Sequence, residues 1–375
     1  MTCFIRSHTR SGKYYTPIAI LHGRYDGWNG FIGQRLWGMP HMLVGEAEKS
    51  WQLLKVFYPL DRIELSGMCV TGTSDGPEGK DDKPRGMYSG TPRGNVDVMP
   101  VEIGDYSDYK LLAFLSYNAA EHSDFDRLEA YVRAGGTLLL GWPHLATTTN
   151  LADIQSYNQH YLYHPIMTSL TYGAPVFETR TLSGQSLSVC VNVAKDIEVM
   201  QTTDDGTPLV YAVKMGEGRI ILINSKLYAA NEIIRPVYEK TLIDLQAALA
   251  AEENDEMNVD VDVQYTVFAQ EDGAKHYYVT PVDWYNQPDF KRHASLRVGE
   301  TRYGMDIDFG TIFKVVVKGN VAAYAVEDTA EVLSVSDTEV RVQGVDVVTV
   351  HILKDGVDKV VIVDCTDEPM RTIQL

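Results

Sequence analysis

The chain of 375 residues has few cysteines and no long apolar run. Its four cysteines lie far apart and form no Cys-x-x-Cys pair, so we expect neither a disulfide framework nor a thiolate zinc site. No stretch approaches the roughly 18 consecutive apolar residues that cross a membrane. Residues 1–6 also lack the apolar segment of a secretory signal. These absences favour a cytoplasmic chain with reduced thiols.

Positive charge is also scarce. The chain has 33 Lys and Arg residues against 51 Asp and Glu residues, a formal net charge of −18. Such a field repels phosphate backbones and anionic lipid, so nucleic acid and membranes are not expected partners. With 45% hydrophobic and 22% charged residues, the composition is that of an ordinary globular protein, and the length suggests two or three domains.

Motifs for the common α/β chemistries are missing. There is no G-x-x-x-x-G-K-[ST], no G-x-G-x-x-G after a strand and no H-E-x-x-H, so we expect no nucleotide cofactor and no metal. Ser74 lies in a literal G-x-S-x-G at residues 72–76, but a polar loop without a helical apolar stripe follows it. That context does not favour a nucleophile elbow. Cys69 is a near miss for the cysteine version of the elbow, and Cys190 lies in the middle of an apolar strand pattern, so both read as strand residues.

The first two thirds of the chain alternate between strand and helix patterns. Strands are expected at 17–21, 97–101, 111–115 and 137–141, a helix at 46–57, and a long polar loop at 72–94. Between the last two strands, Ser123 and Asp126 form a capping-box pattern and Gly135-Gly136 ends the helix. Strand, helix and strand within about 30 residues predict a right-handed βαβ unit.

Strands at 209–213 and 219–223 then meet at a tight turn, and a helix follows at about 232–251. The pattern predicts an α/β layer domain with a mainly parallel sheet over residues 1–255. From residue 259 only strands are expected, spaced as in a β-sandwich, which gives a second domain at residues 256–375. The expected strands of that domain are 261–268, 276–280, 312–317, 321–326, 338–342, 347–352 and 357–363.

Ligands of open parallel sheets bind beyond the carboxyl ends of the strands. The loops that follow the predicted strands offer a mixture of rings, a guanidinium and a carboxylate that suits a sugar. The candidate binding residues are Arg24, Asp26, Trp28, Asn118, Trp142 and His144. The alternative is structural: Trp28 and Trp142 fill domain or subunit contacts, while Arg24 and Asp26 pair with each other.

Glycoside hydrolysis needs two carboxylates about 5–10 Å apart, and spacing in a sequence cannot single out such a pair. Asp26, Asp97, Asp204 and Asp205 are candidates of the weakest kind. An Asp before a turn glycine, as at Asp205-Gly206, is typical of turn chemistry.

Several segments resemble the amidotransferase-like domain behind the catalytic barrel of certain glycoside hydrolases, the β-galactosidase trimerisation type. They are residues 16–28, 47–51, 88–92 and 108–138, together with Gly216-Glu217-Gly218-Arg219. The likeness spans about residues 15–250, and its most distinctive parts are Ala134-Gly135-Gly136-Thr137 and the Gly-x-Gly-Arg hairpin. The strands after Val259 look like the C-terminal β-domain of the same enzymes.

The resemblance implies a flavodoxin-like, three-layer domain of the class I glutamine amidotransferase type, without amidotransferase chemistry, followed by an all-β sandwich. In those enzymes such a domain supports oligomer contacts and lies at the rim of a neighbouring active site. The (βα)₈ barrel that carries their catalytic carboxylates needs about 250 residues, and none of it is found here. We therefore expect either a separately encoded barrel or a fragment of a longer enzyme.

The leading hypothesis is a non-catalytic accessory or C-terminal portion of a carbohydrate-active enzyme, serving oligomerisation, sugar binding or both. Its expected partners are carbohydrate and either copies of itself or a separate barrel subunit. Two alternatives stay open: a glycoside hydrolase in its own right, and a free-standing sugar-binding or scaffold protein of the trehalose-utilisation type.

Overall fold

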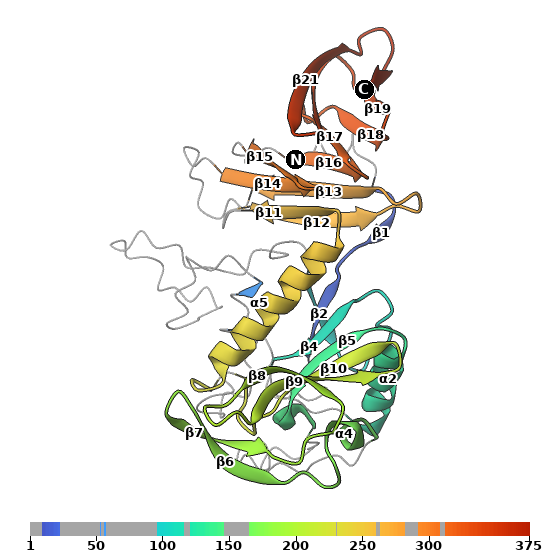
Figure 1. The fold of residues 1–375 in the computed structure, drawn as a ribbon. Helices are drawn as coiled ribbons and strands as arrows, with labels where there is room; N and C mark the ends of the chain where they lie inside the picture. Colours follow the sequence, from blue (N-terminus) through green and yellow to red (C-terminus); the bar gives the residue numbers. More distant parts are fainter. Residues whose placement is uncertain are drawn as a thin grey trace, which may run out of the picture.

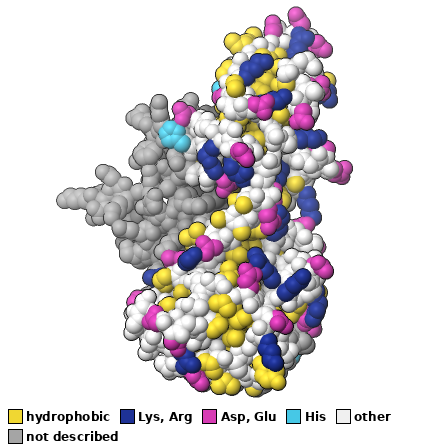
Figure 2. All heavy atoms as spheres, in the orientation of Figure 1, with side chains coloured by type: hydrophobic (Ala, Val, Ile, Leu, Met, Phe, Trp, Pro, Cys, Tyr) yellow, Lys and Arg dark blue, Asp and Glu magenta, His cyan; other side chains and the backbone are white. Residues whose placement is uncertain are grey.

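The fold is taken from a computed structural model of the whole chain. It describes residues 10–22, 53, 56–57, 96–115, 121–145, 165–229, 231–259, 263–281, 292–307 and 312–375. Within these ranges, no helix is long and apolar enough to cross a bilayer. Acidic and basic side chains are interspersed over the face shown in Figure 2.

A seven-stranded sheet organises the first part of the chain, in the order β3-β2-β4-β5-β10-β9-β8 (Figure 1). The first five strands of this order run parallel, and β9 and β8 complete the sheet in antiparallel pairing. All the strands predicted for this region are confirmed to within a few residues. They are β2 (Ile18–His22), β3 (Val96–Pro100), β4 (Leu111–Phe114), β5 (Thr137–Gly141), β9 (Pro208–Met215) and β10 (Gly218–Ile223). The remaining strand, β8 (Ile197–Thr202), was not predicted.

A helix packs against each face of this sheet. Alternate residues of each strand point to opposite faces and so belong to different cores. On one face, Phe125, Leu128 and Val132 of α2 (His122–Arg133) pack with the even-numbered side chains of β10. On the other face, Val237 and Leu242 of α5 (Arg235–Glu252) pack with the odd-numbered ones. The sheet therefore has α5 against one face and α2 against the other, which is why its strands read as continuous apolar runs.

The start of α2 differs from the prediction. The helix begins after Glu121, whose side chain accepts from the backbone at Asp124 while Asp124 accepts from the N–H of Glu121 at 2.8 Å. This capping box lies two residues before the expected pair of Ser123 and Asp126, so that assignment was wrong. Both pairs fit the same spacing rule. Burial decides between them, since Asp124 is fully buried.

The two most distinctive glycine motifs meet at one joint of the sheet. Gly218, at the start of β10, lies so close to the end of α2 that a Cβ there would be 2.2 Å from the carbonyl oxygens of Gly136 and Val132. Two backbone hydrogen bonds hold the joint: the Arg219 N–H donates to Gly136 O at 3.2 Å, and the Glu217 N–H donates to Arg133 O at 3.1 Å. The Gly-x-Gly-Arg turn therefore packs against the end of α2 only because Gly218 has no side chain.

The remaining elements before residue 255 are short. Trp142–Leu145 forms the 3₁₀ helix η5, Pro165–Leu170 the helix α4, and Phe177–Leu182 with Gln185–Cys190 the hairpin β6–β7. The expected helix at 46–57 lies mostly outside the described residues. Leu53, Val56 and Phe57 are described, and all three are buried in the core beside α5.

The rest of the chain is all β and is built on a second seven-stranded sheet, β1-β12-β13-β16-β17-β20-β21. All seven predicted strands are confirmed as β12 (Val263–Ala269), β13 (Lys275–Pro281), β16 (Phe313–Lys318), β17 (Val321–Ala325), β19 (Glu339–Gln343), β20 (Val347–Lys354) and β21 (Val357–Asp364). The prediction missed β11 (Asp255–Val259), β14 (Arg292–Val298), β15 (Thr301–Ile307), β18 (Glu331–Val335) and β22 (Met370–Gln374).

The long sheet is covered on both faces. One face packs on the three-stranded sheet β11-β14-β15, and the other on the three-stranded sheet β18-β19-β22. Neighbouring residues show the alternation: Val315 and Val317 belong to the first core, and Val316 to the second. The region is thus a stack of packed sheets, as a sandwich requires, but with three sheets in place of two.

The predicted boundary between residues 255 and 256 lies just after α5, inside β11. One segment of residues 1–255 departs from that division. The strand β1 (Lys13–Tyr14) pairs antiparallel with β12, so it belongs to the sheet of the second part (Figure 1). Along the described chain, β1 therefore belongs to the all-β part, the following strands form the parallel sheet, and the strands after α5 complete the all-β part.

A charged cluster lies at this junction. Glu253, at the end of α5, accepts from Tyr15 Oη, Lys110 Nζ and Lys275 Nζ, each at 2.7 Å. Desolvation opposes its charge, but these three donors outweigh that effect and lower the pKa of the Glu253 carboxyl to about 2. In addition, Arg297 Nη2 of β14 donates to Ala250 O at 2.7 Å, which satisfies a carbonyl at the C-terminal end of α5. The two parts are tied by polar contacts as well as by the chain.

Candidate functional site

The carboxyl ends of β5 and β10 bring together the side chains that follow these strands. β5 and β10 are parallel neighbours, with Gly141 paired with Ile223 at the end of the register. Trp142 and His144 come directly after β5, and Asn224 follows β10. All three side chains are fully buried. This is the edge at which ligands of open parallel sheets bind, so its contents decide what chemistry the edge can support.

Asn224 is the centre of a hydrogen-bonded network. Its Oδ1 accepts from Trp142 Nε1 at 2.7 Å and from the Cys190 N–H at 3.1 Å. Its Nδ2 donates to Cys190 O at 2.8 Å and to Pro208 O at 2.7 Å. Both donors and both acceptor positions of the amide are therefore engaged by protein. The network joins β5, β7, β9 and β10 and leaves the amide no capacity for a ligand.

His144 is held equally firmly. Its Nδ1 accepts from the Gly141 N–H at 2.9 Å. Its ring stacks on Phe114, with centroids 5.5 Å apart, and meets Tyr238 edge-on at 6.5 Å. Trp142 in turn packs edge-on against Phe177 at 5.3 Å. The structure thus places both predicted binding residues in the core of the first part, with no exposed surface, and their predicted role in sugar binding stays a prediction.

Cys190 ends β7 inside the same network and is confirmed as a strand residue. Its thiol is buried, and Sγ donates to Asn192 Oδ1 at 3.1 Å. Burial raises the pKa of the Cys190 thiol, which lowers the thiolate fraction at neutral pH. The group is therefore a poor nucleophile.

Tyr238 contributes a polar atom that nothing in the sequence predicted. Its side chain is fully buried, and its hydroxyl has no hydrogen-bond partner among the residues that the structure describes. The hydroxyl lies against the end of β5, so close that a Cβ on Gly141 would be 2.2 Å away. Asn224 was also missed, although its position directly after the apolar run 219–223 is the signal that could have found it.

The described carboxylates among the weak candidates serve local structure. Asp204 accepts from the backbone N–H groups of Ser183 and Gly184 at 2.9 and 3.1 Å, and these bonds lower its pKa. Asp205 accepts from Thr203 Oγ1 at 2.6 Å, which confirms the turn interpretation. Asp97 accepts from Tyr109 Oη at 3.1 Å.

The remaining candidates lie outside the described residues: Arg24, Asp26, Trp28 and Asn118, as well as Cys69 and Ser74. Their predicted roles stay predictions. Within the described ranges, no group of three or more His, Cys, Asp or Glu side chains is placed to hold a metal ion.

Comparison with known proteins found no matching family model and no matching curated protein. Among solved structures, the chain is similar to a catalytic mutant of a GH42 β-galactosidase from G. stearothermophilus (16% identity, TM-score 0.45, 81% of this chain and 40% of that one). It is also similar to β-galactosidases from Bacillus circulans sp. alkalophilus (14%, 0.43, 82% and 42%) and from the haloarchaeon Halorubrum lacusprofundi (15%, 0.41, 84% and 42%). The chain thus spans about two fifths of the length of these enzymes.

Proposed function

We propose that this chain is a non-catalytic portion of a cytoplasmic carbohydrate-active enzyme, which acts in assembly and sugar binding. Its first part is a flavodoxin-like domain of the amidotransferase type. The observation that carries the proposal is the closed network of Trp142, Asn224 and Cys190 at the carboxyl ends of β5 and β10. An active amidotransferase needs an exposed nucleophile at a strand-to-helix bend of such a sheet. Here the thiol in the network is buried and its pKa is raised.

The joint between the two glycine motifs supports the same proposal. These motifs carry the sequence resemblance to the β-galactosidase trimerisation type, and in the fold they form one contact between α2 and β10. Their role is therefore architectural. A chain that keeps this architecture and fills the strand ends with core side chains is suited to support a neighbouring catalytic barrel.

The assembly role is supported by the outermost strand of the all-β part. β21 ends the order of the long sheet, and Val360 and Ile362 on it are 54% and 74% exposed. Val347, next to β21 on β20, is 53% exposed. An eight-residue edge strand with apolar side chains in solvent is the kind of surface that a partner covers.

The test of assembly is the mass of the purified chain, measured by light scattering alone and with a co-expressed barrel protein. We expect a complex larger than one chain, and we expect Ile362→Lys to reduce it. Ile243→Lys is the matched control, because Ile243 is a similarly exposed isoleucine (55%) on α5. A strict monomer under both conditions would refute the assembly role.

The sugar-binding role rests on the predicted residues Arg24, Asp26, Trp28 and Asn118. Titration with mono- and oligosaccharides, followed by tryptophan fluorescence, should give a saturable change that Trp28→Phe abolishes. A panel of aryl glycosides should give no turnover. Turnover that falls in Asp26→Asn would contradict the non-catalytic reading and favour a hydrolase.

A further inference from the structure

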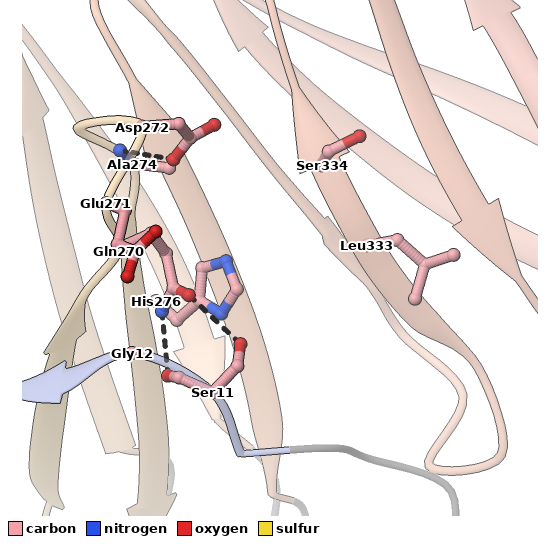
Figure 3. A pocket seen from close by; sticks show the side chains of 9 residues that line it. All are labelled: Ser11, Gly12, Gln270, Glu271, Asp272, Ala274, His276, Leu333 and Ser334. Carbon is pink, nitrogen blue, oxygen red and sulfur yellow. Dashed lines mark hydrogen bonds between the residues drawn. The ribbon is translucent and has the colours of Figure 1, made fainter.

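The all-β part contains a cavity of about 460 Å³ at the tip of the β12–β13 hairpin. It is bounded by that hairpin, by the residues just before β1 and by β18 (Figure 3). Its volume falls within the range of about 300–1,000 Å³ that is typical of small-molecule sites. The lining residues are Ser11, Gly12, Gln270, Glu271, Asp272, Ala274, His276, Leu333 and Ser334.

Two sets of contacts hold one wall of the cavity in place. Gln270 Nε2 donates to Ser11 O at 2.8 Å, and Ser11 Oγ donates to Gln270 Oε1 at 3.0 Å (Figure 3). Gly12 makes this approach possible, because a Cβ there would be 2.3 Å from Gln270 Nε2. Asp272 accepts from Lys318 Nζ at 2.7 Å and from the Ala274 N–H at 3.1 Å. The wall is therefore formed before any ligand arrives.

One polar atom of the lining, Nδ1 of His276, is buried without a hydrogen-bond partner among the described residues. The exposed carboxylate of Glu271 and the partly exposed hydroxyl of Ser334 also line the cavity. His276 is only 5% exposed, and Figure 3 shows its ring beside Ser11 and Gln270, with Leu333 and Ser334 across the cavity. A buried polar atom without a partner is rare in a folded protein, and an unobserved ligand or water is one of its usual causes.

The chemistry of these groups selects the ligand. Burial, together with the charge of Lys314, lowers the pKa of His276 to about 4, so its ring is neutral at physiological pH and offers one donor and one acceptor. The Glu271 carboxylate only accepts and would repel an anion. The Ser334 hydroxyl both donates and accepts. Leu333 and Ala274 add apolar surface beside these polar groups, the combination that binds a molecule with both C–H faces and hydroxyl groups.

We propose that this cavity is a binding site for a neutral polyhydroxylated molecule, a monosaccharide or a short polyol, held by Glu271, Ser334 and His276. Hydroxyl groups of the ligand donate to the carboxylate and exchange hydrogen bonds with the serine and the imidazole. The site lies in the all-β part and uses no residue of the strand ends discussed above. It is therefore independent of the proposed assembly role of β21 and of the predicted sugar-binding residues that follow the parallel strands.

The proposal is tested by saturation-transfer NMR and calorimetry on the full chain, with D-galactose, D-glucose and mannitol as probes. We expect saturable binding of at least one probe. Glu271→Gln and Ser334→Ala should each weaken it about tenfold, the loss expected for one hydrogen bond to a charged or buried partner. Glu300→Gln is the matched control, because it removes one carboxylate from an exposed turn between β14 and β15, and it should bind like the unaltered chain.

Three results would overturn the proposal. The first is no saturable binding of any probe. The second is binding that both cavity variants retain and that Trp28→Phe loses. This result would place the sugar at the carboxyl ends of the parallel strands instead. The third is binding of tetramethylammonium in preference to all three probes, which would assign the cavity to a cation. If the cavity variants lose binding while the mass of the complex is unchanged, this site stands whatever the outcome for assembly.

Discussion

Replacing Gly218 with alanine places a methyl group between two backbone carbonyls. The new Cβ would lie 2.2 Å from the oxygens of Gly136 and Val132, and neither can move without shifting the end of α2 or β5. Overpacking a well-packed site costs about 1–3 kcal/mol, and the upper end applies where backbone must yield. β10 lies between β5 and β9, so a shift of its first residue disturbs two ladders. We expect a loss of about 3 kcal/mol.

Thermal unfolding followed by circular dichroism measures this loss. For a domain of 150–250 residues, 1 kcal/mol lowers Tm by about 2–4 °C, so the transition of the first part should fall by about 6–12 °C. Gly304→Ala is the control: Gly304 lies in β15, and no atom of the described ranges stands within 4 Å of the added Cβ. It should change stability by less than about 0.5 kcal/mol. Equal Tm values for the two variants would refute the argument that the joint requires glycine.

Three further predictions concern buried polar groups. Tyr238→Phe should leave the free energy of unfolding in urea unchanged or raise it, because no described residue bonds to the lost hydroxyl; a clear loss would reveal a bond at that hydroxyl. Glu253 has a depressed pKa, so its stabilising contribution is present above pH 4.5 and is lost as pH falls towards 2; acid titration of Glu253→Gln should show a smaller loss over that window. The fully buried pair of Lys314 and Glu331 should lose about 3–5 kcal/mol in Glu331→Gln but far less in the double variant Lys314→Met, Glu331→Leu, as judged by the same urea assay.

Apolar runs predicted the strands well where both faces of a strand are buried. Residues 137–141 and 219–223 are such runs, and each forms a strand of nearly the predicted length. The strands that were missed lack this signal. In β14 the buried positions alternate with His293, Ser295 and Arg297, so the run reads as polar. In β18 the first buried residue is Glu331, whose charge is hidden by the Lys314 partner that only the fold supplies.

At the candidate site, prediction from the sequence meets a different limit. Sequence patterns located Trp142 and His144 correctly at the end of a parallel strand, because strand ends follow from periodicity. They could not show that both side chains turn into the core, since this depends on Asn224 and Tyr238, which are more than 80 residues away in the chain. The cavity at His276 depends likewise on the approach of residues 11–12 to the β12–β13 hairpin. No local pattern encodes that approach.

The short strand β1 covers one edge of the long sheet by pairing with β12. Its two residues are separated in the sequence from their partners in β12 by some 250 residues. Because β1 precedes β12 in the chain, it is available to cover the β12 edge of the long sheet as soon as that edge forms, which keeps the edge from pairing with other chains. A variant that lacks residues 10–15 would leave the β12 edge permanently unpaired. Its rate of aggregation, compared with that of the full chain, would show how much protection the two-residue strand β1 provides.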